Sequence, residues 1–346
     1  MKQFYLLFFL VVHSCLGYAR PVQLPAALYQ YDTLEVVFTN TYDDVQLAGT
    51  LSFPTDKGRH PAVIMLTGSG AQNRDEEMSG HKPFKVIADY LTRRGIVVLR
   101  YDDRGVGKSK GQFDNSTIGD FSKDALAALA YLKKQDHVDV HKIGFIGHSE
   151  GGLIATLLAG QNVRDLSFIV SLAGPAISID QLMVDQLYAI GKASGMSDPA
   201  LEAAREINEK NFAIVKSDLN NQEAYQGLME NMKMVPGFRK TPDLLAMVSP
   251  AYRYFLRIEP ERYLKKIKIP VFAAFGSLDV QVPATRNLES LYRFLPKNSK
   301  SVLKEYEGLN HLFQQAKTGQ VTEYAQIKET FNERVLNDVA DWITAL

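Results

Sequence analysis

Short, continuous apolar runs recur along this 346-residue chain, and segments with helical spacing separate them. The central runs cover residues 62–66, 96–99, 143–146, 168–172 and 270–275. Between them, apolar residues return every three or four positions, as in the segment that contains Leu126, Leu129 and Leu132. Apolar strands that alternate with amphipathic helices indicate a parallel sheet covered by helices on both faces.

A predicted hairpin precedes the alternating strands and helices, and a long helical stretch interrupts them. Residues 33–38 and 45–51 are strand-like and flank a polar turn, so they predict a hairpin before the parallel strands. From residue 176 to residue 266 the pattern is helical and contains no apolar strand. We therefore predict a core made of residues 20–175 and 267–346, with residues 176–266 inserted as a helical cap over the carboxyl edge of the sheet.

The first 19 residues are typical of a secretory signal peptide. Lys2 precedes an apolar run over 4–12, and small residues lead to Ala19. The run is shorter than the roughly 20 apolar residues that span a bilayer, so we expect no stable membrane insertion. We expect export to the periplasm or the extracellular space. An alternative is processing at Cys15, the single cysteine of the chain, which would leave a lipid anchor.

Charge and motif content exclude several classes of partner. Lysine plus arginine equals aspartate plus glutamate, with 39 of each, so the net charge gives no reason to expect nucleic acid. The sequence has no H-E-x-x-H motif, cysteine pair or carboxylate cluster with metal spacing, and no complete nucleotide-binding motif. We expect neither a metal nor another cofactor, and nothing in the sequence assigns an oligomeric state.

A serine stands in a G-x-S-x-G pattern between a predicted strand and a predicted helix. Residues 147–152 read Gly-His-Ser-Glu-Gly-Gly, after the apolar run 143–146 and before the helix former 153–159. This context places the Ser149 hydroxyl on a sharp turn at the edge of the sheet. Its glycines are required where a side chain would collide between strand and helix. We predict Ser149 as a nucleophile.

A serine hydroxyl needs an adjacent base, and ligands bind beyond the carboxyl ends of parallel strands. Asp279 follows the strand 270–275, and His311 follows the strand 301–306. We therefore predict His311 as the base and Asp279 as the acid that orients it, because the order Ser, Asp, His is the one expected on such a sheet.

The other histidines fit the role less well. His148 belongs to the turn itself, so we expect its ring to pack beside the turn. We expect His81 to lie at the rim of the site, while three others precede their strands at the wrong edge, namely His60, His137 and His141.

The oxyanion of the reaction needs two backbone N–H donors. We predict the N–H of Glu150, which follows the nucleophile, and the N–H of Ser69 in the glycine-rich loop after the first parallel strand, with Gly70 as the alternative. The dense motif at residues 100–109 carries Asp and Arg that can pair, and we expect it to be scaffold.

At these residues the chain resembles the α/β-hydrolase superfamily, and within it the exported bacterial esterases grouped with serine aminopeptidase-like hydrolases. The shared segments are 66–70, 102–107, 147–152, 276–279 and 310–311. The resemblance implies an α/β fold with a mostly parallel central sheet, a helical cap and ester hydrolysis through an acyl-enzyme. One departure is Thr67-Gly68, where many relatives have His-Gly.

We therefore expect a carboxylesterase that acts on a small-molecule ester through Ser149, His311 and Asp279. A serine exopeptidase of the same fold is the alternative. It would need carboxylates that bind a substrate ammonium, and Glu202, Glu206 and Glu209 fall at helical spacing in the insertion. A thioesterase and a binding protein on an inactive hydrolase scaffold are the remaining alternatives.

Overall fold

One mixed sheet forms the centre of the protein. The structure is a computed structural model, and it describes residues 23, 30–235, 238 and 243–346. In this part of the chain eight strands pair in the order β1–β2–β4–β3–β5–β6–β7–β8. They are β1 (Tyr31–Asn40), β2 (Val45–Pro54), β3 (His60–Leu66), β4 (Val97–Tyr101), β5 (Val138–His148), β6 (Phe168–Leu172), β7 (Val271–Gly276) and β8 (Val302–Tyr306).

The direction of the strands agrees with the sequence pattern. Strands β1 and β2 form an antiparallel hairpin, β2 pairs antiparallel with β4, and every later pair is parallel. The predicted hairpin is confirmed, and its strands are longer than expected. The predicted fold class, a mostly parallel sheet, is also confirmed.

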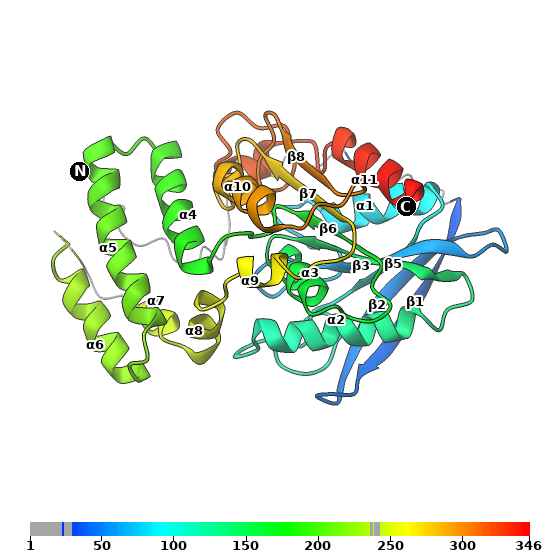
Figure 1. The fold of residues 1–346 in the computed structure, drawn as a ribbon, viewed down its shortest axis with the longest axis horizontal. Helices are drawn as coiled ribbons and strands as arrows, with labels where there is room; N and C mark the ends of the chain where they lie inside the picture. Colours follow the sequence, from blue (N-terminus) through cyan, green and yellow to red (C-terminus); the bar gives the residue numbers. More distant parts are fainter. Residues whose placement is uncertain (1–22, 24–29, 236–237, 239–242) are drawn as a thin grey trace.

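Helices cover both faces of the sheet (Figure 1). Helices α1 and α11 pack on one face, and α2, α3 and α10 pack on the other. Their bounds are α1 (Pro83–Arg93), α2 (Ile118–Leu132), α3 (Glu150–Gly160), α10 (Ala284–Phe294) and α11 (Glu333–Ala345), and a short 3-10 helix, η1 (Val321–Gln326), precedes the last.

Strand β3 shows why the central strands are continuously apolar. Its side chains alternate between the two hydrophobic cores, with Ile64 and Leu66 in one core and Val63 and Met65 in the other. Successive strand residues point to opposite faces, so a strand covered on both sides has no polar position.

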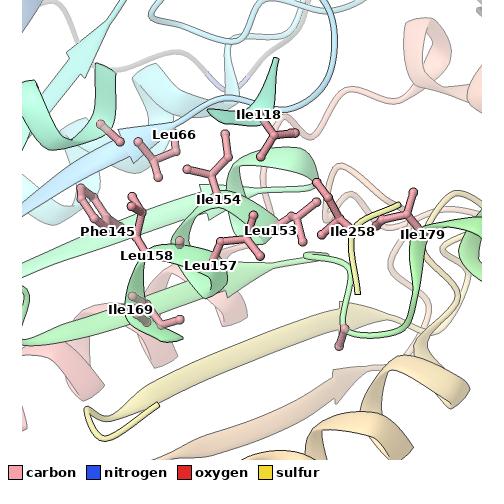
Figure 2. Packing of buried hydrophobic residues seen from close by; sticks show 14 of the residues in the cluster. Leu66, Ile118, Phe145, Leu153, Ile154, Leu157, Leu158, Ile169, Ile179 and Ile258 are labelled. Carbon is pink, nitrogen blue, oxygen red and sulfur yellow. The ribbon is translucent and has the colours of Figure 1, made fainter. Parts of the chain in front are cut away.

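Helix α3, which follows Ser149, is buried on every side (Figure 2). Leu153, Leu157 and Leu158 pack among Phe145 and other residues of the sheet. Burial of each such leucine contributes about 1.5–3 kcal/mol. The turn that carries Ser149 therefore rests on the most deeply packed helix of the core.

The segment between β6 and β7 contains helices and, in its described residues, no strand. Its helices are α4 (Ile179–Ala193), α5 (Asp198–Lys216), α6 (Asn221–Met232), α7 (Asp243–Met247), α8 (Pro250–Leu256) and α9 (Glu261–Leu264). Helices α4 to α8 gather at one end of the molecule, beside the sheet (Figure 1). The exact division into core (20–175 and 267–346) and cap (176–266) stays a prediction.

The predicted signal peptide, with Cys15, lies outside the described residues. Among the residues that the structure describes, no helix combines the length and the apolar character that a membrane crossing requires.

Candidate active site

Ser149 lies on a sharp turn between β5 and α3. Its backbone has φ 52° and ψ −115°, a conformation that is strained for a residue with a side chain. Its N–H donates to the carbonyl of Leu172 at 2.8 Å, which fixes the turn to the end of β6. A Cβ at Gly147 or Gly151 would collide with backbone carbonyl oxygens, so these glycines make the turn possible.

His311 and Asp279 are joined by a hydrogen bond. The Nδ1 atom of His311 lies 2.7 Å from Oδ2 of Asp279, and both side chains are buried. The other carboxylate oxygen of Asp279 accepts the backbone N–H groups of Gln281 and Val282, each at 2.8 Å. The carboxylate is thus fixed by its own loop and can hold the imidazole ring in one orientation.

The turn of Ser149 lies next to His311. The ring of His148 is 4.7 Å from the ring of His311, measured between centroids. The Nε2 atom of His148 also lies 2.9 Å from the carbonyl oxygen of His311. Among the described hydrogen bonds, none joins Ser149 to His311, so the complete catalytic set stays a prediction. Catalytic hydrogen bonds are often long in unliganded enzymes.

The loop after β3 contacts the nucleophile. A Cβ placed on Gly68 would lie 3.4 Å from the Cβ of Ser149. The N–H of Gly68 donates to Glu76 at 2.6 Å and is not available to a substrate. The N–H groups of Ser69 and Glu150 have no partner among the described hydrogen bonds, and Glu150 opens a helix, where N–H groups are free. Both N–H groups therefore stay the predicted oxyanion donors.

Two carboxyl groups support this loop and have raised pKa values. Asp103 accepts from the Thr67 hydroxyl at 2.6 Å and from the N–H of Gln72 at 3.0 Å. Burial raises the pKa of Asp103 to about 8, although these two donors oppose the shift. Burial likewise raises the pKa of Glu150 to about 7, against the hydrogen bond that Ser69 donates to it. Both line a cavity of about 10 Å³, enough for one water molecule.

One buried residue of this region, Glu76, had no clear signal in the sequence. Glu76 is 2% exposed and contacts both Gly68 and His148. Burial lowers the pKa of His148, but the charge and hydrogen bond of Glu76 more than offset this, so the pKa lies above its usual value. His148 does pack beside the turn, as expected. Its contacts with Glu76 and with the carbonyl of His311 were not expected.

The expectation for His81 is wrong. Its side chain is buried, and its ring nitrogens bond Thr330 Oγ1 at 3.0 Å and the Tyr324 carbonyl at 2.9 Å. A segment more than 240 positions away covers it, and the local sequence carries no sign of that.

Ion pairs join the motif at residues 100–109 to other segments, and within the motif Asp102 also accepts the N–H of Lys108 at 3.0 Å. Asp102 pairs with Arg74 at 2.8 Å, and Arg104 pairs with Asp124 at 2.7 Å. These contacts join the motif to the β3–α1 loop and to α2. Within the described residues, no group of three or more potential ligands is placed to hold a metal ion.

A family model described as serine aminopeptidase, S33, matches residues 80–315. The chain belongs to this family. It is thereby a member of the α/β-hydrolase superfamily, as the fold independently indicates.

Individual relatives of this α/β-hydrolase are distant. Esterase EstD of Thermotoga maritima is 28% identical over 305 residues, which are 86% of this chain and 65% of that protein. The chain thus spans about two-thirds of the length of EstD. An uncharacterized 31.7 kDa protein of Escherichia coli is 22% identical, and the match covers 77% of this chain and 88% of that one.

Solved structures share the α/β-hydrolase fold. The Pyrococcus furiosus esterase Pf2001 superposes with a TM-score of 0.54 at 20% identity and covers 95% of this chain and 98% of its own. The α/β-hydrolase GrgF from Penicillium gives a TM-score of 0.56 at 22% identity, with 91% and 98% covered. At these identities the likeness concerns the fold alone.

Proposed function

We propose that this α/β-hydrolase is a carboxylesterase that cleaves small-molecule esters through an acyl-enzyme. The observation that carries the proposal is the buried hydrogen bond between His311 and Asp279, next to a serine on a strained strand–helix turn. Its similarity to EstD, which is named an esterase, supports the choice of an ester as substrate.

The hydrogen bond sets the protonation of the base. Asp279 accepts from Nδ1 of His311, so the neutral ring carries its lone pair on Nε2. That atom takes the proton of the Ser149 hydroxyl as its oxygen attacks the ester carbonyl carbon. Asp279 then stabilises the imidazolium that forms.

The backbone provides the remaining stabilisation. As the tetrahedral intermediate forms, negative charge develops on the former carbonyl oxygen, and the N–H groups of Ser69 and Glu150 donate to it. His311 next protonates the leaving alcohol, and the acyl group stays on Ser149. A water molecule that His311 deprotonates then attacks the acyl-enzyme and releases the acid.

The glutamates that could bind the ammonium group of a peptide substrate are exposed to solvent, which favours an ester as the substrate. Glu202, Glu206 and Glu209 lie on solvent-facing positions of α5, and Glu209 pairs with Arg205 at 3.2 Å. They form a solvated helix face rather than a recess that would bind the amino terminus of a peptide.

The test compares the wild-type protein with Ser149→Ala on p-nitrophenyl esters from acetyl to decanoyl and on aminoacyl p-nitroanilides. We expect ester turnover in the wild type and a loss of at least about 10⁴-fold in the variant, with an unchanged circular dichroism spectrum. Faster cleavage of anilides than of esters would establish the exopeptidase instead. A wild-type protein that a fluorophosphonate probe does not label would be an inactive scaffold.

We also propose export, because the first 19 residues carry the three-part pattern of a signal peptide. Sequencing the amino terminus of the protein secreted by its native cells tests this. A mature chain that begins near Arg20 supports signal cleavage, and a lipidated Cys15 supports the anchored alternative.

A further inference from the structure

Glu76 occupies an unusual backbone and an unusual environment for a carboxylate. It has φ 51°, in the left-handed region that non-glycine residues rarely adopt, and its side chain is only 3% exposed. Apolar side chains surround it and His148, among them Phe84, Leu172 and Leu312. Strain and a buried charge together persist only where the surrounding structure requires them.

The contacts of Glu76 connect three loops of the site. Its Oε1 atom accepts the N–H of Gly68 at 2.6 Å and lies 3.0 Å from Nδ1 of His148. On the other side of the ring, Nε2 of His148 lies 2.9 Å from the carbonyl oxygen of His311. We call this chain of hydrogen bonds the Glu76–His148 bridge. It runs from the loop after β3, through the residue before Ser149, to the loop after β8.

The acceptor at one end determines where the protons lie. A carbonyl oxygen can only accept a hydrogen bond, so Nε2 of His148 carries a proton and donates a hydrogen bond to the backbone carbonyl of His311. Nδ1 faces the Glu76 carboxylate, whose charge raises the pKa of the His148 ring and so favours a proton on this nitrogen as well. The Glu76 carboxylate and the His148 ring therefore compensate each other's charge in their apolar surroundings.

Resting on the carboxylesterase proposed above, we propose that Glu76 and His148 are positioning residues of the reaction. Glu76 accepts the N–H of Gly68. This hydrogen bond orients the peptide group between Gly68 and Ser69, so that the N–H of Ser69 faces the substrate. The bridge also fixes the backbone of His311, so the oxyanion donor and the general base keep one relative placement. Neither Glu76 nor His148 touches the substrate.

Four variants test the bridge. Glu76→Leu and His148→Leu each remove one member, and leucine suits the apolar surroundings. We expect kcat for a p-nitrophenyl ester to fall about 30-fold in each, with KM changed by less than about threefold, because positioning acts in the transition state. In the double variant we expect about the same loss as in the worse single variant, since one bridge is broken only once.

Glu76→Gln is the conservative variant. Its amide oxygen can take the position of Oε1 and still accept from the N–H of Gly68, so that only the contact with Nδ1 of His148 is weakened, and we expect kcat to fall less than in Glu76→Leu. Ser52→Ala is the matched control. It removes a buried hydrogen bond to Thr92, 2.9 Å long, between β2 and α1, and should lower Tm without lowering kcat.

A second measurement does not depend on catalysis. Hydrogen exchange followed by mass spectrometry should show faster exchange in peptides that cover 67–73 and 309–313 in both leucine variants, a smaller increase in Glu76→Gln, and none in Ser52→Ala. Unchanged exchange in the leucine variants, kcat values close to wild type, or single losses that multiply in the double variant would each overturn the bridge. An inactive wild-type protein would refute the esterase and leave the exchange result to decide on the bridge.

Discussion

Asp279 binds His311 with one carboxylate oxygen and its own loop with the other. Oδ2 lies 2.7 Å from Nδ1 of the ring, while Oδ1 accepts two backbone N–H groups. A carboxylate bound in this way has no freedom to turn. The ring that it holds has only one nitrogen left for chemistry.

Asp279→Asn should separate this role from a structural one. An amide at this position can donate to Nδ1, which would place the ring proton on Nε2 and leave no lone pair for Ser149. We expect kcat to fall by about 10⁴-fold at neutral pH, with Tm within a few degrees of the wild type. Steady-state kinetics and calorimetry measure both. An active Asp279→Asn enzyme would remove Asp279 from the mechanism.

The backbone of Ser69 is testable apart from its side chain. Ser69→Ala keeps the N–H and loses only the 3.2 Å hydrogen bond to Glu150, so kcat should stay within about threefold. Ser69→Pro removes the N–H and should lower kcat by about 10²–10³-fold at similar KM. If the proline variant retains activity, the oxyanion donor is the N–H of Gly70.

Asp103 gives a prediction for the pH dependence of stability. Burial raises its folded pKa to about 8, from 3.8 in an unfolded chain. Below pH 3.8 the group is protonated in both states and brings no penalty. As the pH rises towards 8, the unfolded chain ionises first, and the folded state loses relative stability. Asp103→Asn cannot ionise, so its Tm relative to the wild type should increase between pH 4 and pH 8.

The control for this titration is Asp56→Asn. Asp56 is exposed, and its pKa lies below the usual value because it accepts the N–H of Gly58. Its variant should show no relative gain in Tm over the same range. If the difference in Tm between Asp103→Asn and the wild type does not change between pH 4 and pH 8, Asp103 is ionised in the folded protein over this whole range.

Gly151→Ala should prevent the strand–helix turn from forming. The added methyl group would collide with the carbonyl oxygens of Leu66 and Thr67, which belong to the backbone and cannot rotate away. We expect a loss of more than about 4 kcal/mol of folding free energy, or no soluble protein. Gly119→Ala, in the first turn of α2, meets nothing closer than 3.4 Å and should be neutral or slightly stabilising. Chemical denaturation compares the two.

The sequence pattern was sufficient for the parallel strands and for the placement of Ser149, Asp279 and His311 at strand ends. Each of these signals is local, because an apolar run, a turn glycine and the next polar residue are neighbours in the chain. Strand ends of a parallel sheet meet at one edge, so local signals alone predict a shared location. The hydrogen bond between Asp279 and His311 agrees with that prediction.

Contacts between distant loops could not be predicted in this way. Glu76 and His148 are 72 positions apart, and His81 is covered by residues 243 and 249 positions away. Glu76 and His81 lie in the irregular loop between β3 and α1, and His148 ends strand β5, whose pattern gives no sign of a distant partner. Their burial arises from how other loops pack over them, and only the folded arrangement carries that information.

The burial of α3 on all sides has a consequence for how this enzyme can diverge. At its far end, Gly160 abuts the backbone of Tyr263 in α9, where even one extra methyl group would not fit. The helix that supports the nucleophile is therefore wedged between the sheet and the segment that returns from the inserted helices. Mutations that reshape this part of the insertion to admit a new substrate should therefore also disturb the helix that supports Ser149, so new specificity should arise first in helices farther from α9.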